Sequence, residues 1–172
     1  CFEIIEYWII QSKESEEKRS TVEVNQVCRS CFFIAKGCLK ATTYNINLEE
    51  STTNLAFEGE WRTAMHSFIN QQPSNERIVA VEASELLVIS RNQFQILSKE
   101  VPEFESIYTE LLEESYTKSI ERIQTLMAMD ALDRLKWLLE DQPLIFTRLS
   151  NRLIASYLGL SESTLSRLKS KL

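Results

Sequence analysis

Residues 150–172 read SNRLIASYLGLSESTLSRLKSKL and have the pattern of two short helices joined by a tight turn. The apolar residues of the first helix recur at the spacing of one helix face and are Ile154, Ala155 and Leu158. Gly159 stands where the chain must turn sharply, often in a conformation that glycine alone adopts at little cost. Ser161 suits the N-cap of a second helix. The buried stripe of that second helix comprises Leu165, Leu168 and Leu172.

The opposite face of the second helix carries short hydrogen-bonding side chains and one long cation. Such a face suits a helix laid into the major groove of DNA, where base edges present donors and acceptors. The candidates for reading bases are Glu162, Ser163, Ser166 and Arg167. The candidates for contacting phosphates are Ser150, Arg152, Ser161, Thr164 and Lys169. A solvated amphipathic hairpin is the alternative interpretation of the pattern, and we favour DNA binding.

The charge of the chain is unevenly distributed. The 172 residues carry a net charge of −6, yet residues 145–172 hold five Lys and Arg against one Glu, a net +4 that leaves −10 for residues 1–144. An acidic body with a basic end binds a polyanion through that end only. Charge therefore favours the DNA-binding interpretation of the C-terminal pattern.

The composition is that of an ordinary globular protein, with 44% hydrophobic and 26% charged residues. No apolar run reaches the ~18 residues of a membrane span, and residues 1–10 lack the basic start of a signal peptide. We therefore expect a cytoplasmic protein that does not contact a membrane. Because the chain opens with Cys1 and not methionine, we also expect its true N-terminus to lie upstream.

The four cysteines invite two interpretations. The spacing Cys28-x2-Cys31-x6-Cys38 could belong to a metal or iron–sulfur site. No second CxxC and no histidine cluster completes a ligand set, since His66 is the only histidine. We favour cysteines buried in strands and turns, with no metal and no cofactor. Neither a phosphate loop nor a nucleophile or HExxH motif is present, so the sequence does not indicate an enzyme.

The first part of the chain predicts a β-rich domain. Residues Phe2–Ile10 suit a short amphipathic helix, and Gln11–Ser20 reads as a charged linker. From Thr21 to about residue 90 the apolar pattern has period two, in the segments TVEVN, CFFIAKGCLKATTY, STTNLAF, RIVAVE and ELLVIS. Short strands separated by turn residues predict an antiparallel β-barrel, and the helices that follow make the fold class α+β.

Three helices should follow the strands. Ser90 is the expected N-cap of a helix over Arg91–Glu100, and Asp130–Asp141 has a second amphipathic pattern. Between them, Glu103–Met129 is the longest helical segment without Gly or Pro. Its apolar stripe consists of Leu112, Tyr116, Ile120, Ile123 and Met127. We favour a coiled-coil seam between two subunits for this stripe over burial against the chain's own barrel.

This order of elements resembles the Crp/Fnr family of bacterial transcription regulators, and most closely its Bacteroidetes-like branch. The resemblance rests on CFFIAKGCLK (31–40), ERIVAVEASELLVISRNQF (76–94) and IASYLGLSESTLSRLKSKL (154–172). It implies a double-stranded β-helix or jelly-roll sensor like a cyclic-nucleotide-binding domain over residues 1–100. A dimerisation helix over 101–129 and a helix-turn-helix domain over 130–172 would complete a homodimeric regulator. Its implied partners are a palindromic operator in double-stranded DNA and RNA polymerase.

The sensor departs from family members that bind cyclic nucleotides. Those members carry a Gly-Glu pair for the ribose and an arginine for the cyclic phosphate. Thr63-Ala64 and Ser74 stand at these positions here, so we expect an unknown effector or none. The candidate pocket residues are Gly59, Glu60, Ser74 and Arg77. The alternatives are a cyclic-nucleotide-responsive regulator, and a ligand-binding or structural barrel whose basic tail docks an acidic protein.

Overall fold

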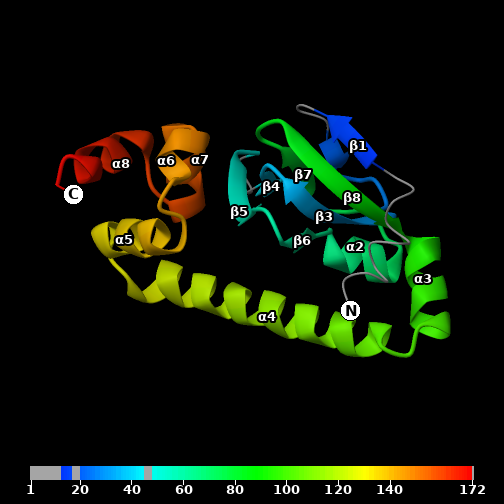
Figure 1. The fold of residues 1–172 in the computed structure, drawn as a ribbon. Coiled ribbons are helices and arrows are strands. Elements are labelled where there is room, and N and C mark those ends of the chain that lie inside the picture. Colours follow the sequence, from blue (N-terminus) through cyan, green and yellow to red (C-terminus); the bar gives the residue numbers. More distant parts are fainter. Residues whose placement is uncertain (1–12, 17–19, 45–47, 172) are drawn as a thin grey trace. The chain divides into compact units, whose positions relative to one another are not determined.

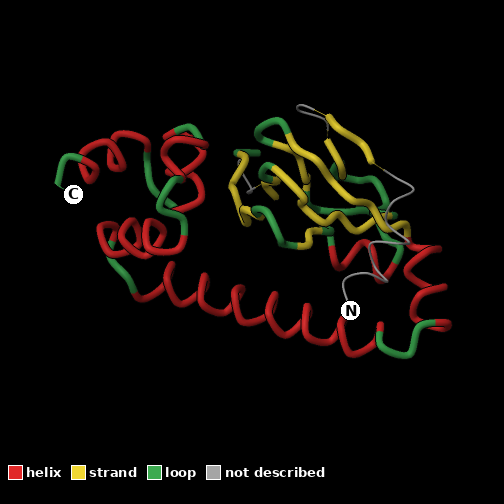
Figure 2. Tube along the Cα trace, viewed as in Figure 1, coloured by secondary structure: helices red, strands yellow, loops and turns green. Residues whose placement is uncertain are grey.

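The computed structural model describes residues 13–16, 20–44 and 48–171. Strands dominate its N-terminal part and helices its C-terminal part (Figures 1 and 2). The chain divides into two compact units, Cys1–Leu111 and Leu112–Leu172, each of which we describe by itself. The helix expected over Phe2–Ile10 lies outside the described residues.

The strands of the first unit form two four-stranded sheets in which every pairing is antiparallel. The first sheet has the order β1-β8-β3-β6, with bounds Lys13–Glu16, Ser84–Ser90, Ser30–Lys36 and Trp61–Arg62. The second has the order β2-β7-β4-β5, with bounds Ser20–Val22, Arg77–Ala80, Leu39–Tyr44 and Glu50–Ala56. Apart from the consecutive strands β4 and β5, neighbours in each sheet come from distant parts of the sequence, as in a jelly roll (Figure 1).

The two sheets face each other across one hydrophobic core. Alternate residues of β3, β4, β7 and β8 point into it because successive side chains of a strand lie on opposite faces. The strand residues in this core include Phe32, Ile34, Leu39, Ala41, Ile78, Ala80 and Leu86. Among the described strands no ladder joins one sheet to the other, so the expected closed barrel is replaced by a two-sheet sandwich.

Helices cover the outer face of the first sheet. Ser90 ends β8 and begins α3 (Arg91–Glu100) with a capping box, because its hydroxyl accepts from Gln93 N and Gln93 Oε1 accepts from Ser90 N. The ring of Phe94 in α3 lies edge-on to Phe104 and Tyr108, 5.1 and 5.0 Å between centroids. These two rings belong to the first turns of α4 (Phe104–Ala128). The helix expected over residues 91–100 is confirmed.

The charged segment Gln11–Ser20 was expected to be a linker, and this was wrong in part. Lys13–Glu16 is strand β1, which pairs with β8 from Lys13↔Leu87 to Glu16↔Ser84. The letters KESE carry no apolar alternation, and a ladder of backbone hydrogen bonds at a sheet edge needs none. The short elements β6, α2 (Met65–Asn70) and α6 (Ile145–Arg148) were also missed.

The second unit is helical. After α4, Asp130 caps α5 (Ala131–Asp141), and α6, α7 (Asn151–Leu158) and α8 (Glu162–Lys169) follow. The side chains that are fully or almost fully buried here are Leu135, Leu138, Ile145, Ile154, Ala155, Leu158 and Leu165. Leu168 is half-buried, and Leu172 lies outside the described residues. Within the described ranges, no helix has both the length and the apolar character that crossing a bilayer requires.

Two arginines bind the C-terminal carbonyl groups of α7. Arg122 of α4 donates from Nη2 to Tyr157 O at 2.8 Å, and its guanidinium lies 3.7 Å from the centre of the Tyr157 ring. Arg134 of α5 donates to Leu158 O at 3.2 Å, to Leu126 O at 2.7 Å and to Met129 O at 3.0 Å. Cations suit this end of a helix, where unpaired carbonyls concentrate negative charge. The pair of arginines therefore fixes α7 against α4 and α5.

Gly37 should tolerate alanine far less well than Gly59. A Cβ on Gly37 would lie 2.2 Å from Ser84 Oγ and 2.7 Å from Ser84 Cα, at a φ of 102°. Gly59 has a φ of 85°, but no atom of the described structure lies within 4 Å of its Cβ position. We expect Gly37→Ala to lower the free energy of unfolding by about 2–4 kcal/mol and Gly59→Ala by about 1 kcal/mol in urea titrations. Equal losses would contradict the close approach of Gly37 to Ser84.

Arg134→Met should destabilise the second unit by about 2 kcal/mol, because three carbonyl oxygens lose a charged donor. Lys136→Met is the matched control, since Lys136 lies on the same helix and its ammonium group forms an exposed ion pair of 3.8 Å with Asp133. We expect the control to stay within about 0.5 kcal/mol of the parent. Thermal unfolding followed by helical circular dichroism measures both variants. A loss of the same size in the two would show that Arg134 does not fix α7.

Candidate nucleic-acid interface and effector site

A short turn sets the direction of α8 relative to α7. The turn begins at Gly159, whose φ of 67° is left-handed and whose N–H donates to Ser156 O at 3.2 Å. Leu160 N donates to Ala155 O at 2.9 Å, which closes the end of α7. Ser161 then caps α8 by accepting from Thr164 N at 3.1 Å. Gly159 and Ser161 therefore occupy the turn and the N-cap that the sequence predicted.

The four candidate base-reading residues are brought together on one exposed surface of α8. Leu165 points the other way and is fully buried. At about 100° per residue, Ser163, Ser166 and Arg167 share a face, and Glu162 lies beside it in the first turn. All four side chains are exposed. This surface can present two hydroxyls, a carboxylate and a guanidinium to a ligand.

The candidate phosphate contacts lie around the two helix starts. Ser150 accepts from Leu153 N at 3.3 Å and is the N-cap of α7, as Ser161 is of α8. Arg152 is exposed in the first turn of α7. The Thr164 hydroxyl lies 2.8 Å from that of Ser161. Helix N-termini present unpaired N–H groups that suit phosphate oxygens.

Lys169 differs from these, because its ammonium group already has partners in its own chain. Its Nζ donates to Asn151 Oδ1 at 3.1 Å and lies 3.9 Å from the centre of the Phe146 ring. These contacts join α8 to the start of α7 and to α6. A phosphate at Lys169 would therefore share the ammonium group with Asn151.

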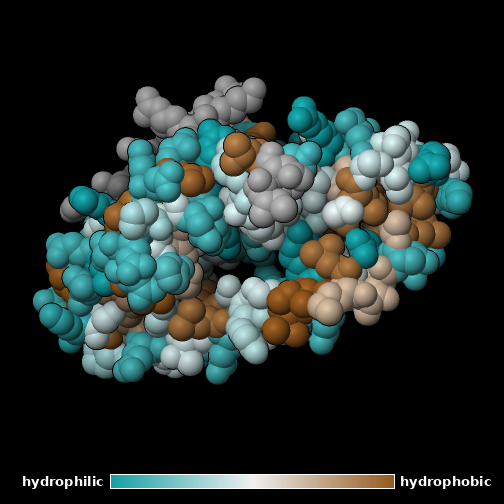
Figure 3. Space-filling model, turned by 180° about the vertical axis from the view of Figure 1, so that it is seen from behind, coloured by the Kyte–Doolittle hydropathy of each residue, from teal (hydrophilic) through white to brown (hydrophobic). Residues whose placement is uncertain are grey.

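The stripe expected at a dimer seam is exposed on the second-unit part of α4. Tyr116, Ile123 and Met127 have 69%, 51% and 82% of their surface exposed, while Leu112 and Ile120 are half-buried. At about 100° per residue the five lie within about 40° of one line along the helix. On the opposite side of the helix, Thr125 is buried. Figure 3 shows apolar surface in the lower middle of this face, bordered by hydrophilic surface.

The four candidate pocket residues do not converge on a common space. Gly59 is exposed in a turn, and the Glu60 carboxylate accepts from Phe57 N at 2.8 Å. The Ser74 hydroxyl is used within the turn between α2 and β7, where it binds Glu76 O and Glu76 N. Arg77 lies on the opposite face of β7 from buried Ile78, and its Nε is 3.1 Å from Glu23 Oε2.

Sequence reasoning missed the charged pair that does lie toward the interior. Arg62 Nη2 donates to Glu76 Oε2 at 2.5 Å, and the two side chains are only 19% and 28% exposed. Neither residue has a distinctive motif, because the pair depends on the register of a two-residue strand. Strand alternation from Trp61 could have suggested that Arg62 faces inward, had β6 been recognised.

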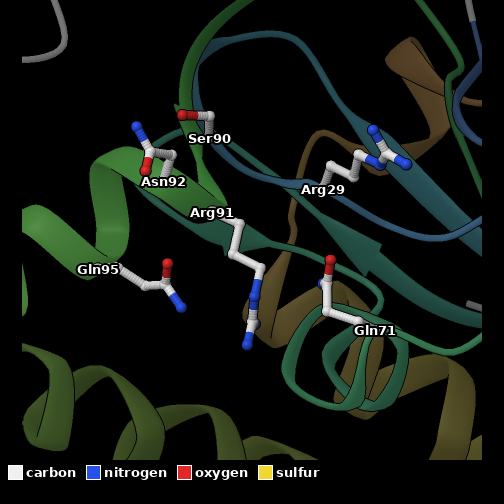
Figure 4. Close-up of a pocket in the computed structure, with 6 residues that line it drawn as sticks. All are labelled: Arg29, Gln71, Ser90, Arg91, Asn92 and Gln95. Atoms are coloured by element: carbon white, nitrogen blue, oxygen red, sulfur yellow. The ribbon is translucent and has the colours of Figure 1, made fainter.

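An open polar cleft lies where the end of α2 meets the start of α3 (Figure 4). It is lined by Arg29, Gln71, Ser90, Arg91, Asn92 and Gln95. Arg91 and Gln71 both donate to Phe68 O, the latter at 2.8 Å, and the Arg91 guanidinium also lies over the Phe68 ring. The Arg91 guanidinium in this cleft therefore links the start of α3 to Phe68 of α2.

The cysteines do not form a metal centre in the described part of the chain. No group of three His, Cys, Asp or Glu side chains there could hold an ion. Cys28 and Cys38 are buried, and burial raises the pKa of the Cys31 thiol to about 12. A thiol with so high a pKa carries almost no thiolate at neutral pH, and thiolate is the form that binds metals and reacts. Cys28 Sγ instead contacts Thr63 Oγ1 at 3.3 Å.

Comparison with known proteins identifies the fold. Residues 16–100 match the cyclic nucleotide-binding domain family, while no curated protein sequence matches the chain. FixK2 from Bradyrhizobium japonicum is similar in structure, with a TM-score of 0.78 and 16% identity over 94% of this chain and 83% of FixK2. The c-di-GMP responsive global regulator CLP from Xanthomonas campestris has a TM-score of 0.78 and 16% identity over 99% of this chain and 91% of CLP.

A transcriptional regulator of the CRP/FNR family from Thermus thermophilus has a TM-score of 0.72 and 14% identity, covering 94% of this chain and 85% of its own. At sequence identities of 14–16%, these structural similarities show a shared fold and nothing more. Residues 16–100 of this chain therefore match the cyclic nucleotide-binding domain family, and the chain as a whole has the fold of the solved Crp/Fnr transcriptional regulators.

Proposed function

We propose that this protein is a homodimeric, sequence-specific DNA-binding transcriptional regulator of the Crp/Fnr type. The observation that carries the proposal is the exposed polar face of α8, held in place by the Gly159 turn and by buried Leu165. The two helices then form a helix-turn-helix in which α8 enters the major groove. The protein acts in the cytoplasm on an operator, with RNA polymerase as a further partner. Kinship with the Bacteroidetes-like branch remains a prediction.

Charge and helix ends support DNA as the ligand. The N-termini of α7 and α8 each present a capped first turn, with Ser150 and Ser161 as the caps. The basic residues of the segment 145–172 include exposed Arg152, Arg167 and Lys171. Phosphate contacts of this kind set register and orientation, while side chains toward base edges supply specificity. Arg167 is the residue best suited to a guanine, which a guanidinium can bind through O6 and N7.

The exposed stripe of α4 supports a dimer. Tyr116, Ile123 and Met127 are apolar side chains exposed along one face, and single exposed hydrophobic residues do not usually align in this way. A parallel pairing with a two-fold mate would bury them and place two α8 helices about 34 Å apart. The operator is then a palindrome with half-sites about ten base pairs apart.

Two other functions would use the same surfaces differently. A scaffold that docks an acidic protein through its basic end would bind DNA with little discrimination between sequences. A cyclic-nucleotide-responsive regulator would need a cation for the phosphate, and Arg77 is on the outer face of β7 in an ion pair with Glu23. CLP is described as c-di-GMP responsive, and the residues described here give no reason to carry that ligand over. We therefore propose an unknown effector or none.

Arg167→Ala should relax sequence preference at one position of each half-site and cost roughly 1–3 kcal/mol on the preferred operator. Arg152→Ala is the control, because Arg152 is an exposed candidate phosphate contact. The loss of a phosphate contact weakens binding to all sequences alike and lowers the salt slope by about one. Fluorescence anisotropy on an operator and its single-base variants, at several salt concentrations, measures both effects. If Arg167→Ala weakens every sequence equally, Arg167 contacts only phosphate.

Ile123→Asp should convert the dimer to monomers, because it places a charge in the centre of the apolar stripe. Thr117→Asp adds the same charge to the same helix, about 100° away from the centre of the stripe, and should leave the dimer intact. Sedimentation velocity on the three proteins measures the outcome. An Ile123→Asp variant that still sediments as a dimer would place the subunit interface elsewhere.

A further inference from the structure

The Arg62–Glu76 pair lies on the inner side of the first sheet. The register of β6 places Arg62 opposite Phe32 and Trp61 opposite Phe33. Directly opposed residues of an antiparallel pair project to the same face. Since Phe32 belongs to the core that the two sheets share, the side chain of Arg62 leaves its strand toward that core. Trp61 instead packs with the outer cluster around Leu97 and Phe104.

The guanidinium of Arg62 is desolvated and incompletely paired. Burial lowers the pKa of Arg62, and the charge of Glu76 opposes this effect. Its Nε is buried and has no hydrogen-bond partner among the described residues. A guanidinium has five N–H donors, and a buried donor without an acceptor is costly. Such a group suits an oxyanion with several oxygens better than it suits one carboxylate oxygen.

Glu76 is held in place by a turn that is itself anchored. Ser74 is buried, and its hydroxyl donates to Glu76 O at 2.9 Å and accepts from Glu76 N at 3.0 Å. The backbone of Ser74 exchanges two hydrogen bonds with the segment before β3, from its N to Gln26 O at 2.9 Å and from Asn25 N to its O at 2.8 Å. A fixed loop therefore positions the Glu76 carboxylate beside the Arg62 guanidinium.

We propose that Glu76 is a built-in counter-ion, which occupies an oxyanion site formed by Arg62 and keeps a small phosphate or carboxylate ligand out. A buried guanidinium needs an anion to offset its desolvation, and for Arg62 this anion is the carboxylate of Glu76. A second anion would bring like charges together beside one guanidinium, in surroundings that screen them poorly. This inference deepens the proposed function, since it explains how a sensor of this family can work without an anionic effector. The test of this inference uses no DNA. The inference and the proposed DNA-binding function can therefore fail independently of each other.

The test compares the parent protein with Glu76→Gln in thermal melts, while inorganic phosphate replaces chloride at constant ionic strength. The parent should show no saturable response to phosphate or to cyclic AMP, since the general stabilisation by phosphate salts rises gradually with concentration. In Glu76→Gln the vacated guanidinium should bind phosphate, and the melting midpoint should rise by about 3 °C or more in a saturable way. Glu100→Gln removes one negative charge from an exposed site of the same unit and should behave like the parent. Adding Arg62→Met to Glu76→Gln should abolish the response.

Two results would overturn the proposal. A folded Glu76→Gln variant whose midpoint ignores phosphate would show that the pair is structural only. A parent protein stabilised by phosphate through Arg62 would show that Glu76 does not exclude anions. If Glu76→Gln fails to fold in chloride, refolding in phosphate that Arg62→Met abolishes supports the site, and failure to refold in phosphate, or refolding that survives Arg62→Met, contradicts it.

Discussion

The guanidinium of Arg134 joins three backbone carbonyl groups, two at the end of α4 and one at the end of α7. Together with Arg122 on Tyr157, it binds the last turn of α7 immediately before the Gly159 turn. The direction of α8 depends on that turn, so these two cations determine how the second unit presents its polar face. Because each donor meets a carbonyl that the helix end leaves unpaired, charge and hydrogen bonding act in the same direction.

In the first unit, the alternation of side chains along the strands decides which residues enter the core. It has the structural role that the arginine pair has in the second unit. Inward-pointing residues of both sheets make one core, and outward-pointing residues of β6 and β8 meet α3 and the start of α4. Alternation also decides where the charges lie. Arg77 is on the outer face with Glu23, whereas Arg62 starts on the inner face and meets Glu76. The interior charge is thus neutralised by the chain itself.

Local signals in the sequence were sufficient for most helices and strands. Ser90 as the cap of α3, Gly159 as a turn and Ser161 as the cap of α8 are short-range features whose chemistry does not depend on distant parts of the chain. Strand β1 was not predicted, because an edge strand can consist of polar residues and then shows no apolar alternation. The Arg62–Glu76 pair and the three bonds of Arg134 escaped because they join residues that only the tertiary fold brings together. The polar face of α8 and the Gly159 turn were predictable from the sequence, whereas the arginine contacts to the end of α7 were not.

Selection of DNA from a random pool at physiological salt tests the central claim most directly, because the operator sequence emerges from the selection itself. If α8 reads base edges in a two-fold dimer, the bound sequences should converge on a palindrome whose half-sites lie about ten base pairs apart, centre to centre. A bound pool as diverse as the starting pool, with affinity governed by salt alone, would contradict sequence-specific recognition by this protein.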